Sequence, residues 1–302
     1  YLPRAWHGKI LKSCMENDRI TWVECPRDAM QGVVRFYPTE AKVRYLKQLM
    51  HCGFDVIDIG SFVSPKVIPQ MADSAEVIRQ LSPHKKGNKF LVICANKRGV
   101  DEAIDHPGVD IIGFPFSLSE TFQQRNTKRS REEAIDELKG HAERIKAAGK
   151  SLVVYISMAF GNPYGEVWLA DELAEWAKAI QQHCQPEAIA LSDTVAKATA
   201  SRVRAAVNKV KALAPEAVLG LHMHVSGRDP MGSGVIQAGW ESGIRRFDTA
   251  LLGFGGCPMA QDSLCGNLPT EALLSFAAKM KAKHKLSTTS LESAHNAALA
   301  FF

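Results

Sequence analysis

Leu221-His222-Met223-His224-Val225 alternates apolar and polar residues near the start of the last third of the chain. This is the pattern of a β-strand, in which successive side chains point to opposite faces. The two histidines therefore project together, while the three apolar residues pack on the other face. Two imidazoles on one face suit a divalent metal ion. An isolated His-x-His pair is common by chance, so its meaning depends on the strands around it.

Short apolar strands recur along the chain and alternate with longer amphipathic helices, which is typical of a parallel sheet with crossover helices. The predicted strands are residues 20–25, 56–59, 90–93, 109–114, 152–156, 188–191, 218–222 and 246–249. Eight such units, without a linker or a composition break, favour a single (β/α)₈ TIM barrel over residues 1–302. An open doubly wound sheet would usually carry a Gly-rich phosphate loop after its first strand, and none is present.

Predicted helices lie between these strands, and several carry signals for their ends. Thr39 and Thr270 are predicted N-caps, Ser130 with Glu133 forms a capping box, and Gly53 is expected to end the first long helix. Other helices are expected after Pro65 to about residue 81, and over residues 166–183, 195–213 and 234–242. Additional C-terminal helices are expected from about residue 270 onward.

Composition excludes several classes of protein. The net charge of +5 over 302 residues is mild and suits an anionic small molecule, but no clustered Lys/Arg surface indicates a nucleic-acid partner. The seven cysteines are scattered and form no CxxC motif, so reduced thiols are expected. No apolar run approaches a membrane span and no signal segment is visible, so we expect no membrane partner and a cytoplasmic location. The chain begins with Tyr1, which leaves a removed leader open.

Active sites of such barrels lie at the C-terminal ends of the strands, and polar residues gather there in this chain. Asp193 has a plainer interpretation as a helix N-cap and Asn96 as a turn residue. Their shared position at one end of the barrel is what the plainer interpretations do not predict. The candidates are Arg27, Asp28 and Gln31 after the first strand, Asp58 and Ser61 at the second, Asn96 and Lys97 at the third, Asp193 after the sixth, His222 and His224 at the seventh, and Asn267 after the eighth.

One carboxylate, two imidazoles and one amide form a mixed set of oxygen and nitrogen ligands. Such a set leaves positions open for water and a chelating substrate, which favours Mg²⁺ or Mn²⁺ and permits Zn²⁺ or Co²⁺. The predicted ligands are Asp28, His222, His224 and Asn267.

Longer motifs resemble the 3-hydroxy-3-methylglutaryl-CoA lyase family over nearly the whole chain. The matching stretches are Pro26-Arg27-Asp28 with Gln31, Ser61-Phe62-Val63-Ser64-Pro65-Lys66, Asp193-Thr194, His222-x-His224, and Gly253-Phe254-Gly255-Gly256-Cys257-Pro258 followed by Gly266-Asn267-Leu268. The resemblance implies a metal-dependent barrel that cleaves a 3-hydroxy-3-carboxymethyl acyl-CoA, such as 3-hydroxy-3-methylglutaryl-CoA, to acetyl-CoA and acetoacetate. It also suggests a homodimer.

The same resemblance implies roles for individual residues. Arg27 would stabilise the negative charge that moves onto the thioester oxygen, and Cys257, on a Gly-rich loop, would protonate the acetyl-CoA carbanion. Either Asp28 or Asp58 could be the base, so this choice stays open. Asp193 joins the catalytic set. The residues expected to contact substrate or coenzyme A are Gln31, Ser61, Lys66, Asn96 and Lys97.

Some positions depart from the family pattern. Asp58 stands where the family usually has Glu, Ala190 where a serine is usual, and Val225 where an Asp follows the second histidine. These changes put the acyl group in question more than the reaction type. The alternatives are an aldolase or lyase for a related hydroxy acid or branched acyl-CoA, and a catalytically silent binding relative.

Overall fold

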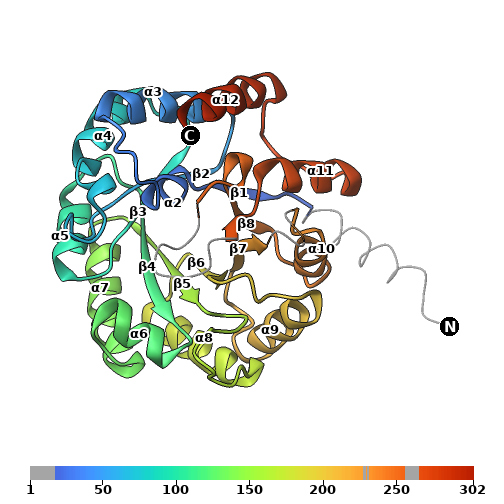
Figure 1. Cartoon of the computed structure of the whole chain (residues 1–302). Coiled ribbons are helices and arrows are strands. Elements are labelled where there is room, and N and C mark those ends of the chain that lie inside the picture. The colour runs from blue at the N-terminus through green and yellow to red at the C-terminus, as the bar shows by residue number, and fades with distance from the viewer. Residues whose placement is uncertain (1–17, 227–228, 230, 256–264) are drawn as a thin grey trace, which may run out of the picture.

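The computed structural model describes residues 18–226, 229, 231–255 and 265–302. Eight parallel strands form a closed barrel with helices around it (Figure 1), which confirms the predicted (β/α)₈ fold. Closure is shown by the pairing of the first strand with the eighth and of the sixth with the seventh. The strands are β1 (Thr21–Glu24), β2 (Val56–Ser61), β3 (Lys89–Ile93), β4 (Ile111–Ser117), β5 (Ser151–Ser157), β6 (Ala188–Asp193), β7 (Leu219–Ser226) and β8 (Arg246–Thr249).

Helices cover the outside of the barrel, as the amphipathic patterns predict. They include α3 (Thr39–Met50), α4 (Ser74–Leu81), α5 (Lys97–Asp105), α7 (Arg131–Ala147), α8 (Ala170–Cys184), α9 (Ala200–Leu213), α10 (Ser233–Glu241), α11 (Thr270–Met280) and α12 (Thr288–Phe301). Short elements on the mouth side were not predicted. They are α2 (Pro26–Gln31), α6 (Glu120–Thr127) and β9 (Cys265–Asn267), the last of which pairs antiparallel with β7.

The ends of several helices differ from prediction. The capping box at Ser130 and Glu133 is present, but Pro38 and Pro269 occupy the N-cap positions that were assigned to Thr39 and Thr270. Both threonine hydroxyls instead donate to carboxylates of other elements. Thr39 bonds Asp73 at 2.8 Å and Thr270 bonds Glu24 at 2.6 Å. Tertiary partners therefore replace the local caps.

Three helices also begin later than predicted. The segment after Pro65 forms a 3₁₀ turn over Pro69–Met71 before α4, α8 begins at Ala170, and α9 begins at Ala200. Before α9, the Asp193 carboxylate accepts hydrogen bonds from the backbone N–H groups of Lys197 and Ala198, at 2.9 and 2.7 Å. These bonds hold the chain in a loop where the periodicity alone favours helix.

Strand alternation divides the apolar residues between two cores. The larger core lies between the strands and the surrounding helices. The smaller core fills the barrel interior with inward-facing side chains, and polar groups replace them toward the C-terminal ends of the strands. Its members are Val23, Cys25, Val56, Leu91, Ile111, Val153, Tyr155, Ala188 and Ala190.

The C-terminal helices pack against the start of the barrel, and α12 lies beside α3 (Figure 1). Phe301 stacks on Tyr37 and Tyr45, with ring centroids 4.1 and 4.8 Å apart. Phe302 stacks on Phe254, which precedes the Gly-rich loop. Across the described residues, none of the helices is long and apolar enough to cross a membrane.

Candidate metal centre and active site

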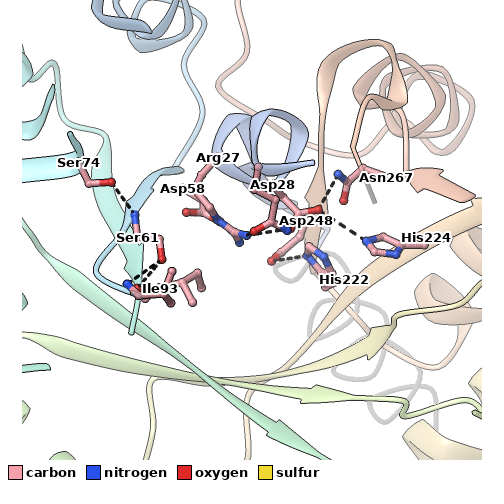
Figure 2. Close-up of polar contacts among 12 residues, drawn as sticks. Arg27, Asp28, Asp58, Ser61, Ser74, Ile93, His222, His224, Asp248 and Asn267 are labelled. Carbon is pink, nitrogen blue, oxygen red and sulfur yellow. Dashed lines mark hydrogen bonds and ion pairs between the residues drawn. The ribbon is translucent and has the colours of Figure 1, made fainter. Parts of the chain in front are cut away.

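The first part of the site lies on α2, directly after β1. Pro26 occupies the first helical position, where a missing N–H costs no hydrogen bond. Arg27 and Asp28 follow in the first turn and are both buried. The sequence predicts them at the end of a strand, whereas the structure places them on a short helix that points them across the barrel mouth (Figure 2).

The Arg27 guanidinium joins the two candidate carboxylates. Its Nε and Nη2 donate to Asp58 Oδ2 at 3.0 and 2.6 Å. Its Nη1 donates to Asp28 Oδ1 at 2.9 Å and to Gln31 Oε1 at 2.8 Å. Gln31 Nε2 in turn donates to Asp28 Oδ1 at 2.6 Å. One buried cation is thus shared by two buried anions, which leaves one negative charge uncompensated at this position.

His222 and His224 lie on the same face of β7, as the alternation predicts (Figure 2), and Met223 belongs to the core between the strands and the helices. His224 Nδ1 lies 3.0 Å from the carbonyl oxygen of Thr194. A carbonyl can only accept, so this contact assigns the proton to Nδ1 and leaves a lone pair on Nε2. That Nε2 is buried, lacks a hydrogen-bond partner among the described residues, and lies 3.6 Å from Asp28 Oδ2.

Asn267 reaches the same point from β9, opposite His224 in the strand register. Its Nδ2 donates to Asp28 Oδ2 at 2.8 Å and to the carbonyl oxygen of Phe254 at 2.9 Å. Gly255 passes close by with a φ of +97°, and a Cβ there would lie 2.7 Å from both Asn267 Nδ2 and the Cα of Ala29. A glycine is therefore needed where the loop meets the predicted ligands.

The arrangement fits a divalent ion. One ligand atom each from Asp28, His222 and His224 lies within 4.8 Å of the others. Among the described residues the buried Nε2 of His224 makes no hydrogen bond, and such an atom is one that a metal can satisfy. A carboxylate and two imidazoles, with the Asn267 amide beside them, are a donor set that divalent ions accept.

The two carboxylates that share Arg27 have different proton affinities. Burial alone would raise the pKa of Asp28, but the Arg27 charge and the two histidines outweigh it and hold that pKa well below its usual range. Burial raises the pKa of Asp58 to about 6, although Arg27 opposes the shift. Asp28 is therefore a permanent anion, while Asp58 exchanges a proton near neutrality.

The other predicted residues lie outside this hydrogen-bonded cluster. Ser61 is buried and its hydroxyl donates to the carbonyl of Ile93 at 3.1 Å. Asp193 is also buried, but it is not a helix N-cap: Thr199 caps α9, and the Asp193 carboxylate accepts from N–H groups of the loop before that helix. Asn96 is the N-cap of α5, and Lys97 pairs with Asp101 on the surface. Lys66 is exposed. Cys257 lies outside the described residues.

A cavity of about 170 Å³ opens at the barrel mouth. Arg27, Asp28, Gln31, His222 and His224 contribute to its wall, so the predicted residues line a space that can hold a ligand. Most of the remaining wall was not predicted. It comprises Val63, Ile68, Ile93, Ala95, Pro115, Phe122, Asn126, Tyr155, Ser157, Ser192 and Thr194.

The two groups that contact the Nδ1 atoms of the histidines were also not predicted from the sequence. Asp248 on β8 lies 3.4 Å from His222 Nδ1, and the Thr194 carbonyl anchors His224. Asp248 alternates with Phe247 in a predicted strand, so its inward direction could have been read from the sequence. The backbone contact of Thr194 has no sequence signal.

Curated proteins similar to this chain include lyases of hydroxymethylglutaryl-CoA. Hydroxymethylglutaryl-CoA lyase, mitochondrial, from Mus musculus is 31% identical over 249 residues, which cover 82% of this chain and 75% of that protein. The 3-hydroxy-3-isohexenylglutaryl-CoA/hydroxy-methylglutaryl-CoA lyase of Pseudomonas aeruginosa is 32% identical over 258 residues, covering 82% of this chain and 81% of that protein.

Solved structures give the same result. An HMG-CoA lyase from Acinetobacter baumannii, in complex with coenzyme A and 3-methylmalate, superposes with a TM-score of 0.85. It is 26% identical, and the match covers 94% of this chain and 92% of that one. The HMGL-like family model matches residues 19–297, and with the barrel and the cluster at its mouth this shows that the chain belongs to the HMGL-like family.

Proposed function

We propose that this protein is a divalent-metal-dependent carbon–carbon lyase that cleaves 3-hydroxy-3-methylglutaryl-CoA, or a close analogue, to acetyl-CoA and a 3-oxo acid. The observation that carries the proposal is the cluster of Asp28, His222 and His224 beside the Arg27–Asp58 pair. It places a metal-binding set next to a cation and a carboxylate that titrates near neutrality. The relatives named as HMG-CoA lyases support the substrate class.

Asp28, His222, His224 and Asn267 would hold the ion, and Mg²⁺ or Mn²⁺ are the candidates that the oxygen-containing donor set favours. Zn²⁺ and Co²⁺ remain alternatives for the same residues. When bound, a divalent ion lowers the pKa of a coordinated hydroxyl and offsets negative charge that develops beside it.

Asp58 is the better of the two candidate bases. The pKa of Asp28 is held too low for it to accept a proton efficiently, and its Oδ2 lies beside Asn267 and His224. Asp58 has a pKa of about 6, and its Oδ1 is buried without a hydrogen-bond partner in the described part of the chain. An efficient general base has a pKa near the working pH. We therefore assign to Asp58 the removal of the proton from the tertiary hydroxyl.

Arg27 then acts on the charge that the bond cleavage releases. As the hydroxyl loses its proton, a carbonyl forms and the adjacent carbon–carbon bond breaks, which moves the electron pair toward the thioester oxygen. A protonated Asp58 binds the guanidinium less strongly, so N–H groups now donated to Asp58 become available for that oxygen. Proton removal and stabilisation of the enolate are thereby coupled through one side chain. The proton that completes acetyl-CoA is assigned to Cys257, outside the described residues.

The proposed coenzyme A contacts include two lysines. Lys66 and Lys97 lie at the surface, and the Lys97–Asp101 pair is exposed enough to be exchanged for a phosphate at small cost. Gln31 lines the cavity directly and is the best-placed of the proposed substrate contacts. The homodimer and the cytoplasmic location stay predictions. Analytical ultracentrifugation would test the first, and localisation of the tagged full-length protein the second.

The test is release of acetyl-CoA from 3-hydroxy-3-methylglutaryl-CoA with Mg²⁺ or Mn²⁺, for wild type beside Arg27→Gln. We expect the variant to lose a factor of about 10² to 10³ in kcat, as is usual when one oxyanion-stabilising group is removed. Equal, negligible release from both proteins would contradict the proposal. A panel of related hydroxy acids and branched acyl-CoA esters would then separate another lyase from a silent binding protein.

A further inference from the structure

Asp248 and Arg246 are buried in the barrel behind His222, and the proposed reaction does not use them. Asp248 is opposite His222 in the register of β7 and β8, and Arg246 is opposite Gly220, two residues further from the mouth. Asp248 is 2% exposed and Arg246 is 4% exposed. A buried ion pair at this depth is weak evidence for stability, since desolvation of both charges offsets their attraction.

Arg246, Asp248 and His222 contact one another in that order, from the barrel interior toward the proposed metal ligands. Arg246 Nη2 lies 3.7 Å from Asp248 Oδ1, and Asp248 Oδ2 lies 3.4 Å from His222 Nδ1 (Figure 2 shows the second contact). Within the described residues, Arg246 Nη2 and Asp248 Oδ1 have no hydrogen-bond partner. Arg246 and Asp248 therefore offset each other's charge in part, with the Tyr155 side chain against both, and the second oxygen of Asp248 faces the imidazole.

Neighbouring residues leave space for Arg246 and restrict the His222 ring. A Cβ at Gly220 would lie 2.9 Å from Cδ of Arg246, so only glycine leaves space for the arginine. The Tyr155 ring meets His222 edge-on, with centroids 5.6 Å apart and an interplanar angle of 87°. The His224 ring lies on another side, with centroids 5.5 Å apart. His222 is thus confined by packing, and its Nδ1 faces Asp248 Oδ2.

The two histidines are anchored by different means. His224 bonds a backbone carbonyl, which no substitution of a side chain removes, whereas His222 depends on a carboxylate. We propose that Asp248, held by Arg246, is a positioning residue for the metal centre: its carboxylate accepts a hydrogen bond from Nδ1–H of His222 and leaves Nε2 free for the ion. The inference rests on the proposed metal site. Carboxylate–histidine–metal arrangements of this kind are common, and loss of the outer partner typically weakens metal binding about 10- to 100-fold.

The experiment measures the affinity for Mn²⁺ from the EPR signal of the free ion, without substrate. An amide in place of the carboxylate is a weaker acceptor and can donate to Nδ1, which favours the wrong tautomer. We expect Asp248→Asn to weaken Mn²⁺ binding about 10- to 100-fold. Because Asp248→Asn leaves Arg246 uncompensated and could fail to fold, the double variant Arg246→Met/Asp248→Asn removes both charges. It is expected to fold and to show the same loss of affinity.

The control is Asp73→Asn, which removes the carboxylate that pairs with the buried Lys42 of α3; Asp73 is half-buried and precedes α4. It should lower the melting temperature and leave Mn²⁺ affinity unchanged. A second readout is the ¹⁵N NMR spectrum of the histidine rings, in which His222 should change from one tautomer to a mixture in both Asp248 variants. Unchanged Mn²⁺ affinity in the folded double variant would overturn this inference alone, while absence of Mn²⁺ binding to wild type would overturn the proposed function with it.

Discussion

At the scale of single residues, the site depends on carboxylates whose surroundings give them different protonation states. Asp28 and Asp58 share Arg27, yet one pKa is held well below the usual range and the other is raised by burial to about 6. A third carboxylate, Glu24 at the end of β1, is fully buried. Burial raises its pKa to about 8, although Thr270 and the Leu251 N–H donate to it. Neighbouring acids in one barrel thus titrate over different pH ranges.

The Asp58 assignment predicts a pH profile. A base with a pKa of about 6 is active when deprotonated, so kcat/KM of wild type should rise as the pH passes about 6 and be level above it. Asp58→Asn should lose a factor of about 10² to 10⁴ and show no such rise. Asp58→Glu keeps a carboxylate and is the matched control. An Asp58→Asn enzyme with the wild-type profile would show that another group is the base.

Glu24 predicts a pH dependence of stability. Its pKa is raised from 4.5 to about 8 in the folded state, so the folded protein binds this proton more tightly than the unfolded chain. The contribution is fully present below about pH 4.5 and is lost as the pH rises through about 8. Between these limits, wild type should lose stability as the pH rises, relative to Glu24→Gln. Urea unfolding of both proteins at pH 5, 6.5 and 8 would measure it, and parallel pH curves would contradict it.

At the scale of elements, the site is assembled by short pieces of chain at the barrel mouth. α2 carries Arg27 and Asp28, β7 carries the histidines, and β9 brings Asn267 opposite His224. Gly255 lets the chain pass between α2 and Asn267 at a positive φ. The predicted ligands therefore come from segments far apart in sequence, and the close passage of one glycine keeps them together.

Gly255→Ala tests this close passage. Its Cβ would lie 2.7 Å from the backbone of Ala29, so the loop must move and carry Asn267 with it. Gly149 is the matched control, because it also has a positive φ, +71°, but a Cβ there meets no atom within 4 Å. Gly149→Ala should cost only the backbone strain, ~1–2 kcal/mol in urea unfolding, and leave Mn²⁺ affinity unchanged. Gly255→Ala should lower both stability and Mn²⁺ affinity; equal effects of the two substitutions would show that the contact is unimportant.

At the scale of the whole molecule, the C-terminal helix α12 packs against residues that follow β1, in and before α3. Phe301 of α12 stacks on Tyr37 and on Tyr45 of α3, and Phe302 stacks on Phe254 at the mouth. The sequence predicts the C-terminal helix but not its partners. Because these contacts join segments at opposite ends of the sequence, they contribute to closing the barrel.

Phe301→Ala should therefore lower the free energy of unfolding by ~1–3 kcal/mol, less than for a fully buried Phe because its ring is half-buried. Leu299→Ala on the same helix is the control, since Leu299 is 58% exposed and should change stability by no more than ~0.5 kcal/mol. Urea unfolding measures both. Equal effects of the two substitutions would show that the aromatic contacts do not stabilise the barrel.

The sequence by itself determined the eight strand units, the common face of His222 and His224, and the motifs that gave the family. These follow from strand alternation and from residues close together in the chain, so they need no tertiary information. It also placed the candidate ligands at one end of the barrel, although the metal itself stays a proposal.

Only the tertiary structure decided which groups meet. It paired Arg27 with Asp58, placed Asp248 behind His222, and gave the hydroxyls of Thr39 and Thr270 to carboxylates on other elements. Each of these contacts joins residues 31 positions apart or more, except that of His222 with Asp248, which spans 26. Local periodicity fixes the direction in which a side chain points, but its partner depends on how the closed barrel brings distant strands together.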